Sequence, residues 1–482
     1  MPSLKGAAAV LFFPPRLRDT RLNMNHQAKI LTKGNLWKNV LLFSLPLVAS
    51  NLLQVLFNMS DIAIVGKFAE NGDAALGSVG STATVVTLFT GFLIGIGGGI
   101  NVVVATAFGS GDRAGLEKSV HTAAILAPAI GLLLTAIGML GVRPLLEALD
   151  TKAELIDGAE LYLRIYYVGM PAVAVFNFGN GVYSAVGNTR KPLIILSLSG
   201  AVNIALNLFF VIVCKFDVVG VALASVLSQY LSALLVLLSL FRSDESFSLR
   251  LSGMKLSGDK AKKILVLGVP AGLQNIVFAI ANLFIQKAVN SFDPVTVEGI
   301  VAAQNADPLV YDVLAAFYMA CSSFIGQSFG QKDKKTVLQS YFICQVYSFA
   351  LGAMLGLSLA FFSRPFLFLF TSSEAVVQAG TYRLKIMGVS YMVSSLMDCV
   401  IAASRGLGKT LIPTVFVILG SCVFRIVWVL TVFRHYGTLS SLFLLYVFSW
   451  TLTAIAEIVY FFFVFRKTTA TFCREEKKTP AG

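Results

Sequence analysis

The sequence predicts an all-α integral membrane protein whose twelve transmembrane helices form two pseudo-symmetric six-helix bundles. Three observations predict this fold class: an apolar composition, twelve runs long enough to cross a bilayer, and an internal repeat. Of the 482 residues, 56% are hydrophobic and only 13% are charged, and the mean hydropathy is +0.78. Because soluble domains carry about 25% charged residues, we expect this chain to lie in a membrane.

Apolar runs of membrane-spanning length recur along nearly the whole chain. A transmembrane helix needs about 20 consecutive apolar residues, whereas a membrane β-barrel would alternate apolar and polar residues over about ten positions. The chain lacks that alternation, so we predict helices. The expected spans are 36–64, 76–108, 120–143, 158–187, 191–214, 218–241, 262–290, 299–329, 336–363, 377–403, 411–434 and 440–465.

The basic residues predict the orientation in the membrane. Lys and Arg concentrate on the cytoplasmic side of membrane proteins, and 27 of the 38 lie in the terminal segments and in alternate loops between the spans. We therefore expect a multi-pass protein of the cytoplasmic membrane with both termini in the cytoplasm. The net charge of +13 reflects this asymmetry, and no basic stripe with interleaved aromatics predicts a nucleic-acid partner.

The segments outside the spans are expected to be cytoplasmic. Residues 1–35 begin with a basic stretch, but Pro14 and Pro15 interrupt its short apolar run, so we interpret them as a disordered extension and not as a cleaved signal. Met24 offers an alternative start. Residues 467–482 are expected to form a cytoplasmic tail.

Two copies of a six-helix unit are visible in the sequence. The segment LPLVASNLLQVLFN (45–58) aligns with VPAGLQNIVFAIAN (269–282) at an offset of 224 residues, and FGSGD (108–112) aligns with FGQKD (329–333) at 221. An even number of helices gives both copies the same orientation, with a substrate path between them. We predict an N-terminal bundle at 36–241, a cytoplasmic linker at 242–263 and a C-terminal bundle at 264–466.

Three patterns that could indicate an enzyme or a cofactor are better explained otherwise. The six cysteines and three histidines form no metal-binding or disulfide pattern. ASRGLGKT (403–410) fits only a loose phosphate-loop pattern without the required strand. Gly91, Gly95 and Gly99 in and before GIGGGI recur every four residues, which predicts close helix packing. We expect no enzymatic activity, no cofactor and no structural metal.

A polar stripe marks the first span. Asn51, Gln54, Asn58 and Asp61 are spaced by 3, 4 and 3 residues, so they project from one side of a helix. A carboxylate at the bilayer centre costs about 2.5–3.5 kcal/mol on insertion scales, and such residues usually serve a function. We therefore predict that Asp61 serves transport.

These features together resemble the multidrug and toxic-compound extrusion (MATE) family. The resemblance rests on the run Gln54-x-x-Phe57-Asn58-x-x-Asp61-x-x-Ile64-Val65-Gly66, on the loops FGSGD and FGQKD, on GNTRKP (187–192), and on the duplicated twelve-span layout, and it covers about 36–466. It implies an antiporter whose two bundles form a cleft that opens alternately to either side. The substrates would be small organic molecules, and we expect a monomer in the lipid bilayer.

The resemblance also implies a cation-coupling site. In one branch of the family the acid of helix 1 acts with polar residues of helices 5 and 6, which correspond here to Asp61, Asn203, Asn207 and Ser225. The expected span boundaries place Asp61, Asn207 and Ser225 at one depth. Similar proteins often have a second aspartate where Asn207 stands, and the seventh span lacks the glutamate of the sodium-coupled branch. Proton coupling is therefore favoured, with sodium at Asp61 as the alternative.

Further polar residues are expected to line the substrate cleft. Asp398 lies where some MATE proteins carry a functional aspartate, and the offset of 221 pairs it with Asn177. We expect Asp312 and Glu457 instead to pair with Arg425 or Arg383 in a structural role. The predicted cleft residues are Gln54, Asn58, Asn177, Asn180, Asn275, Asn282, Asp307 and Asp398.

Three functions are compatible with these observations. The first is a cation-coupled exporter of amphipathic organic cations by alternating access, whether drugs and other xenobiotics or a specific natural metabolite. The second, a flippase of lipid-linked precursors, would place several Arg or Lys in the cleft. The third, a membrane-embedded enzyme, would need a catalytic dyad, and His121 has no evident nucleophile beside it.

Overall fold

The computed structural model describes residues 30–69 and 72–476, and throughout this part of the chain the regular elements are helices. Among the described residues, eleven helical stretches, some made of two or more consecutive elements, are long and apolar enough to span a membrane. The pair α4–α5, bent by 49°, gives a twelfth span if it is counted as one. The predicted all-α membrane fold is therefore confirmed. Called α or, for π- and 3-10 helices, η, the elements are α1 (Leu36–Phe68), α2 (Gly72–Gly109), α3 (Arg113–Ala148), α4 (Ala153–Val168), α5 (Met170–Ala185), α6 (Arg190–Leu208), η1 (Phe209–Val213), α7 (Asp217–Phe241), η2 (Leu251–Gly253), α8 (Gly258–Val289), α9 (Pro294–Gln304), α10 (Ala306–Gly330), α11 (Lys334–Phe361), α12 (Ser363–Leu367), α13 (Glu374–Gly406), α14 (Leu411–Val417), η3 (Ile418–Val423), α15 (Phe424–Trp428), η4 (Val429–Phe433), α16 (Arg434–Tyr436) and α17 (Leu439–Glu476).

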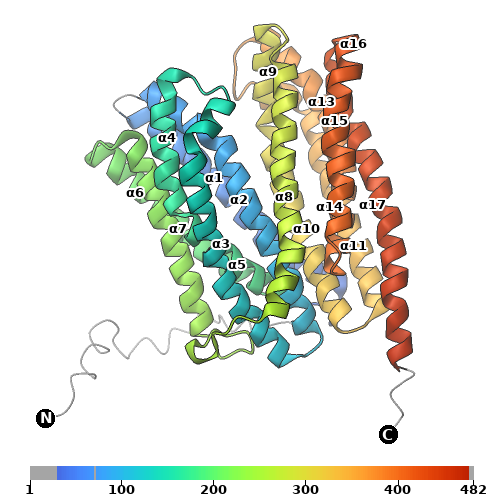
Figure 1. Ribbon diagram of the computed structural model, residues 1–482. Coiled ribbons are helices and arrows are strands. Elements are labelled where there is room, and N and C mark those ends of the chain that lie inside the picture. The colour runs from blue at the N-terminus through green and yellow to red at the C-terminus, as the bar shows by residue number, and fades with distance from the viewer. Residues whose placement is uncertain (1–29, 70–71, 477–482) are drawn as a thin grey trace, which may run out of the picture.

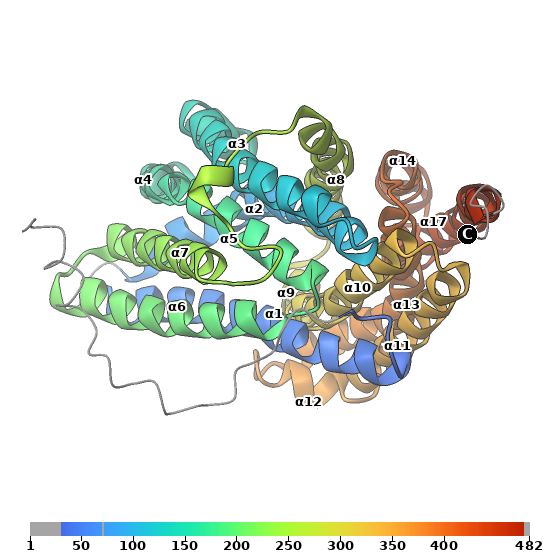
Figure 2. The same ribbon diagram turned by 90° about the horizontal axis from the view of Figure 1, so that it is seen from below.

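The helices form two groups that lie side by side. Helices α1–α7, the N-terminal half, lie toward one side and the later helices of α8–α17, the C-terminal half, toward the other, with α8 between them (Figure 1). We call the end at which α17 finishes the lower end and the opposite end the upper end, as drawn in Figure 1. Seen from below, α1 runs from beside α6 to beside α10 and α11, and it packs against both groups (Figure 2).

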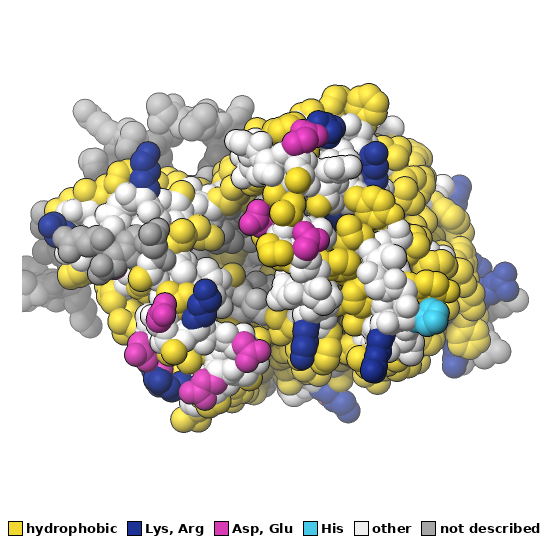
Figure 3. Space-filling model, turned by 90° about the horizontal axis from the view of Figure 1, so that it is seen from above, with side chains coloured by type: hydrophobic (Ala, Val, Ile, Leu, Met, Phe, Trp, Pro, Cys, Tyr) yellow, Lys and Arg dark blue, Asp and Glu magenta, His cyan; other side chains and the backbone are white. Residues whose placement is uncertain are grey.

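The exterior of the helices is apolar, as a lipid environment requires. Large hydrophobic side chains that are more than half exposed occur on helices of both groups, among them Leu132, Leu140, Val459 and Phe463. Charged side chains instead gather at the ends. Figure 3 shows the upper end, where acidic and basic side chains lie in small groups among hydrophobic ones. One exposed pair at the start of α13, Arg364 with Glu374, has an N–O distance of 2.6 Å.

Residues 30–35 were expected to be disordered, and for them this prediction is wrong. The N–H of Leu31 donates to Oε1 of Gln327 in α10 at 2.9 Å, and the Thr32 hydroxyl donates to Oε1 of Gln331 at 2.9 Å. Leu31 is 2% exposed. The segment is ordered because α10 supplies side-chain acceptors that the local sequence does not reveal. The rest of the predicted extension, 1–29, and Met24 within it lie outside the described residues.

The boundaries of the C-terminal half also differ from those expected. Helix α8 begins at Gly258, inside the predicted linker, and α17 continues to Glu476, inside the predicted tail. The connection between α7 and α8 packs on the lower end of α3. There the Arg250 N–H donates to Nε2 of His121 at 3.0 Å, and the Ser257 N–H donates to Oγ1 of Thr122 at 3.1 Å.

The internal repeat is visible in the backbone as well as in the sequence. Gly187 and Gly408, 221 residues apart, both adopt a left-handed conformation, with φ of 85° and 76°. The aspartates of FGSGD and FGQKD are both helix N-caps: Asp112 accepts the Gly115 N–H at 2.8 Å, and Asp333 accepts the Thr336 N–H at 3.0 Å. An N-cap supplies an acceptor to an otherwise unpaired helix N–H. The matching loop motifs are thus explained by equivalent turns and caps.

The two groups approach most closely where α2 crosses α8. A Cβ atom on Gly95 would lie 2.3 Å from the Gly272 nitrogen, and one on Gly99 would lie 2.6 Å from the Gly268 nitrogen. One turn higher, the Asn275 side-chain amide donates to the Gly91 carbonyl at 2.7 Å. Small residues allow such close backbone approach between membrane helices. The packing role predicted for Gly91, Gly95 and Gly99 is therefore confirmed.

We predict that Gly95→Ala destabilises the contact between α2 and α8. The added methyl group would meet the backbone of α8, which cannot move aside as a flexible side chain could. Overpacking of this kind typically costs about 1–3 kcal/mol. Thermal unfolding of the detergent-purified protein should show a lower unfolding temperature.

The matched control is Gly98→Ala on the same helix, because a Cβ atom there would meet no atom within 4 Å. That variant should unfold at the wild-type temperature or slightly above it, since Ala favours helix over Gly. Equal unfolding temperatures for the two variants would contradict the assigned role of Gly95.

Candidate functional site

The carboxylate of Asp61 lies among polar side chains inside the N-terminal half. Asp61 is near the upper end of α1, and its Oδ1 accepts a hydrogen bond from Nδ2 of Asn207 at 2.5 Å. Its Oδ2 accepts one from the Ser225 hydroxyl at 3.2 Å. Asn207 belongs to α6 and Ser225 to α7, so the site joins three helices.

Asn203 completes this group from the preceding turn of α6. Its Oδ1 lies 3.3 Å from Nδ2 of Asn207, and Asn203, Asn207 and Ser225 are 5%, 0% and 6% exposed. The structure therefore brings together all four residues that the resemblance implied. We call Asp61, Asn203, Asn207 and Ser225 the Asp61 cluster.

Two tyrosines close the cluster from α4, and sequence reasoning did not identify them. Tyr162 and Tyr166 are buried, their rings stack with centroids 5.8 Å apart, and both interact electrostatically with Asp61. Their spacing of four residues places them on one helix face, which was the available signal. No Lys or Arg contributes to the cluster's interactions among the described residues. The cluster can therefore hold one positive charge, a proton or a small cation.

The polar stripe of α1, formed by Asn51, Gln54, Asn58 and Asp61, has different surroundings at different heights of the helix. In the lower half of α1, Val40 and Leu47 are buried in a core shared with α10, α11, α13 and α17. Asn51 follows on this face and donates from Nδ2 to the main-chain carbonyl of Asp312 at 2.8 Å. Gln54 and Asn58, one and two turns further, are exposed. The face that packs against the C-terminal half below is therefore exposed above, where it carries the amides of Gln54 and Asn58.

Helix α8 shows the same change. Gly268, Gly272 and Asn275 contact α2, whereas Asn282, two turns above Asn275 on this face, is exposed. Gln54, Asn58 and Asn282 are thus all exposed, each above a contact between the two halves. The Asn275 amide is instead engaged by the Gly91 carbonyl.

The remaining predicted cleft residues have other surroundings. Asn177 and Asn180 are half-buried in α5, and Asn177 donates to the Val173 carbonyl of its own helix at 2.9 Å. Asp398 is half-buried in α13, where its Oδ2 accepts a hydrogen bond from the Ser394 hydroxyl at 3.2 Å. Arg405 and Arg425 interact electrostatically with Asp398.

The predicted pairing of the C-terminal acids is wrong in its partners. Arg383 pairs with Asp307, with an N–O distance of 2.7 Å, and Tyr391 also donates a hydrogen bond to Asp307. Neither carboxylate oxygen of the fully buried Glu457 has a hydrogen-bond partner among the described residues. The sequence alone cannot tell which of several acids faces a given arginine on another helix, because the answer depends on how each helix is rotated about its axis.

Arg425 is held by aromatic rings instead of a carboxylate. Its guanidinium lies 4.5 Å from the ring centre of Tyr446, 5.0 Å from that of Trp450 and 5.7 Å from that of Phe278. Ring faces attract a cation and stabilise it where water is excluded. This arrangement explains how a buried Arg425 is tolerated without a carboxylate in direct contact among the described residues.

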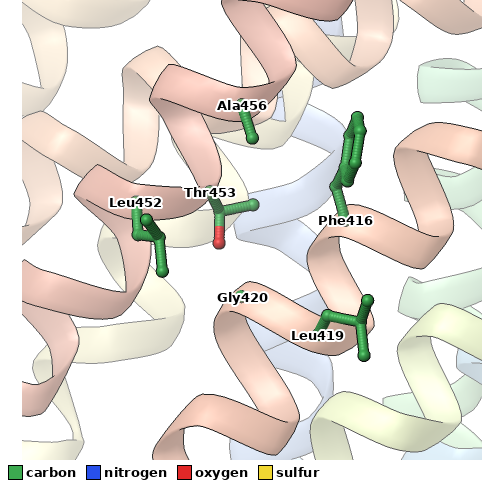
Figure 4. A pocket seen from close by; sticks show the side chains of 6 residues that line it. All are labelled: Phe416, Leu419, Gly420, Leu452, Thr453 and Ala456. Carbon is green, nitrogen blue, oxygen red and sulfur yellow. The ribbon is translucent and has the colours of Figure 1, made fainter.

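An apolar cavity of about 230 Å³ lies elsewhere, between the helix formed by α14 and η3 and helix α17 (Figure 4). Its one polar side chain, Thr453, is hydrogen-bonded to Ser421 at 2.9 Å. The cavity has no ionisable lining residue and is separate from the Asp61 cluster. It is lined by Phe416, Leu419, Gly420, Leu452, Thr453 and Ala456.

We predict that Arg383→Gln destabilises the protein strongly. Arg383 is 1% exposed, so its removal would leave the Asp307 carboxylate in a poorly solvated site without its cation. Breaking a buried pair from one side costs about 3–5 kcal/mol. The unfolding temperature and the yield of folded protein in detergent should both fall.

The exposed pair Arg364–Glu374 provides the comparison, because exposed pairs contribute about 0–1 kcal/mol. Arg364→Gln should leave the unfolding temperature nearly unchanged. A similar small effect for Arg383→Gln would show that the Asp307 pair does not support the fold.

Comparison with known proteins identifies the family. The MatE family model matches residues 46–209 and again 270–431, and the two matches begin 224 residues apart, the offset found in the sequence. A probable multidrug resistance protein of Bacillus subtilis, YpnP, is 28% identical over 307 residues, which are 64% of this chain and 68% of the relative. A probable multidrug resistance protein of Thermotoga maritima, NorM, is 25% identical over 388 residues, covering 78% of this chain and 82% of the relative.

Solved structures agree with the fold. A multidrug resistance MATE transporter in its outward-facing conformation superposes with a TM-score of 0.83 at 22% identity, over 94% of this chain and 99% of that structure. A MATE structure in a bent conformation gives a TM-score of 0.84 at 21% identity, over 92% and 98% of the two chains. Because the family model covers well over half of the sequence, this chain belongs to the MatE family of membrane transporters.

Proposed function

We propose that this protein is a cation-coupled antiporter that exports amphipathic organic cations, and that the Asp61 cluster binds the coupling ion. The observation that carries the proposal is the cluster itself: one carboxylate, hydrogen-bonded by Asn207 and Ser225, between three membrane helices. An ionisable group at membrane depth is costly and usually marks an ion pathway. The expected orientation, with both termini in the cytoplasm, makes the upper end the outer one.

A proton is the favoured coupling ion. The cluster carries one formal negative charge, which a single proton neutralises, and α8 has no Asp or Glu between Ile264 and Val289. Protonation would remove the acceptor charge that Asn207 and Ser225 stabilise, so it would weaken the link between α1 and helices α6 and α7. Proton binding is thereby connected to the position of α1.

Sodium is the second candidate ion, favoured by one observation. Oδ1 of Asn207 is buried and has no hydrogen-bond partner among the described residues. With the Asp61 oxygens and Oδ1 of Asn203 it would offer a small cation several oxygen ligands. A single carboxylate is nevertheless a weaker cation site than a pair, so proton coupling remains our proposal.

The substrate class follows from the family and from the region between the halves. The relatives YpnP and NorM are named as probable multidrug resistance proteins, which supports small organic substrates. Another relative, from Shewanella oneidensis, is an FAD transporter that is 22% identical over 72% of this chain, so a specific metabolite is an alternative cargo. A flippase of lipid-linked precursors would need basic residues to bind phosphate, and Gln54, Asn58 and Asn282 are neutral.

We predict that Asp61→Asn abolishes efflux driven by a proton gradient while the protein stays folded and inserted. Asn keeps the size and hydrogen-bonding capacity of Asp but cannot titrate. The measurement is efflux of a cationic dye from proteoliposomes with an imposed proton gradient and no sodium. Wild-type rates for Asp61→Asn would show that this carboxylate does not couple transport.

Ser225→Ala is the matched control in the same cluster, because it removes one hydrogen bond and leaves the titratable group in place. Ser225→Ala should slow proton-driven efflux by less than Asp61→Asn does.

An imposed sodium gradient without a proton gradient should drive little efflux by the wild type.

We further predict that Asn207→Asp increases the response to sodium. The substitution places a second carboxylate beside Asp61, where the nitrogen now lies 2.5 Å away, and added ligand charge strengthens cation binding. Efflux should be compared under separate proton and sodium gradients for the variant and the wild type. An unchanged ratio of the two rates would contradict the assignment of this cluster to the coupling ion.

A further inference from the structure

One face of α10 passes from a tight helix contact to the open region between the halves. Pro308, Asp312, Ala315, Met319 and Ser323 are spaced by 4, 3, 4 and 4 residues and therefore share that face. At its lower part Ser323 is fully buried and exchanges hydrogen bonds with Asn101 of α2 at 3.0 and 3.2 Å.

Above that contact the same face is less covered. Met319 and Asp312 are half-buried, and Ala315 and Pro308 are exposed. Because Ser323 on this face bonds to Asn101 of α2, the face is turned toward the N-terminal half. Asp312 lies beside α1, because Asn51 donates a hydrogen bond to the Asp312 main-chain carbonyl. Gln54 and Asn58 follow Asn51 on α1, one and two turns above this contact.

Asp312 differs from the other buried and half-buried acids of the C-terminal spans in lacking a basic neighbour. Asp307 is paired with Arg383, and Asp398 and Glu457 each interact electrostatically with Arg405. The Asp312 carboxylate has no hydrogen bond, ion pair or charged neighbour among the described residues. It is thus a half-buried carboxylate with an open side and no compensating charge.

We propose that Asp312 binds the positively charged centre of the exported substrate, with Gln54, Asn58 and Asn282 as neutral polar surroundings. This inference rests on the proposed function and names the residue that would select for cationic cargo. A carboxylate that is partly withdrawn from water attracts a cation much more strongly than one in bulk solvent. The neutral amides bind by hydrogen bonds without repelling a cation, so the charge selection falls to Asp312.

In this proposal two different carboxylates bind the two ions: Asp61 binds the coupling ion and Asp312 binds the substrate. Asp61 points between α1, α6 and α7 within the N-terminal half, where small cations fit. Asp312 is half-buried on the face of α10 that meets α2 lower down, outside the Asp61 cluster. Removing charge from Asp312 should therefore change substrate affinity without removing the coupling group.

The test is equilibrium binding of tetraphenylphosphonium, a permanent organic cation, to the full-length protein in detergent at one fixed pH. Triphenylphosphine oxide, which is neutral and similar in shape, serves as the uncharged probe. Asp312→Asn should weaken binding of the cation at least about tenfold, which is about 1.4 kcal/mol. The same variant should leave binding of the neutral probe unchanged, and Asp312→Glu should retain tight cation binding.

Asp150→Asn is the matched control for net charge. Asp150 is exposed in the loop between α3 and α4 with φ of 54°, a conformation that Asn also adopts readily. It should bind the cation as the wild type does. Size-exclusion profiles and unfolding temperatures verify that each variant is folded.

The outcomes separate this inference from the proposed function. If the wild type and Asp312→Asn bind tetraphenylphosphonium equally, Asp312 is not the cation-binding residue, while the proposed function stands. Equal weakening for the cation and the neutral probe would also overturn the inference, because it would indicate lost shape and not lost charge. If the wild type binds no organic cation at all, both the inference and the cationic substrate class are wrong.

Discussion

The close contact between α2 and α8 is the constraint on which the rest of the structure depends. Gly95 lies against Gly272, and Gly99 lies against Gly268, at distances that exclude any side chain. This contact brings the two halves together in their lower part, and the buried bonds between Asn101 and Ser323 extend it to α10. Above this contact, Gln54 and Asn58 of α1, Asn282 of α8 and Ala315 of α10 are exposed. The substrate region that we propose lies on this side of the contact.

Much of the fold could be predicted from the sequence because it follows from one-dimensional patterns. Apolar run lengths gave the spans, and the offset of 221 between Gly187 and Gly408 corresponds to a repeated backbone conformation. Helix boundaries were less predictable. The start of α8 at Gly258 and the order of residues 30–35 depend on contacts with α3 and α10, which a local pattern does not contain.

The candidate site was predictable in part for the same reason. Asp61 was recognisable because one carboxylate interrupts an apolar helix. The resemblance to the MATE family implied Asn207 and Ser225 as its partners, and their expected depth agreed with this grouping. The acids of the C-terminal half could not be sorted in this way. Asp307 and Asp312 lie five residues apart in α10, which places them on different faces, and only the packed structure tells which one meets Arg383.

Charge compensation then distinguishes structural from functional acids. An ion in the membrane is stable when paired, hydrogen-bonded or surrounded by aromatic rings. The Arg383–Asp307 pair and the aromatic surroundings of Arg425 meet this requirement within the protein. Asp61 has only neutral donors, and Asp312 has no donor to its carboxylate among the described residues. These two side chains retain the capacity to bind a positive charge from outside.

Helix α1 is the element that connects them. Its lower half is buried against the C-terminal half through Val40 and Leu47, whereas Asp61 in its upper half is bonded to α6 and α7. Pro46 lies in the lower part of α1 and cannot donate a backbone hydrogen bond there, which makes this part of the helix easier to bend. Asn51, between Pro46 and Asp61, holds the main chain at Asp312. Any movement of upper α1 that follows a change of charge at Asp61 must therefore also strain or release the contact at Asp312, so the two carboxylates are joined by one continuous helix.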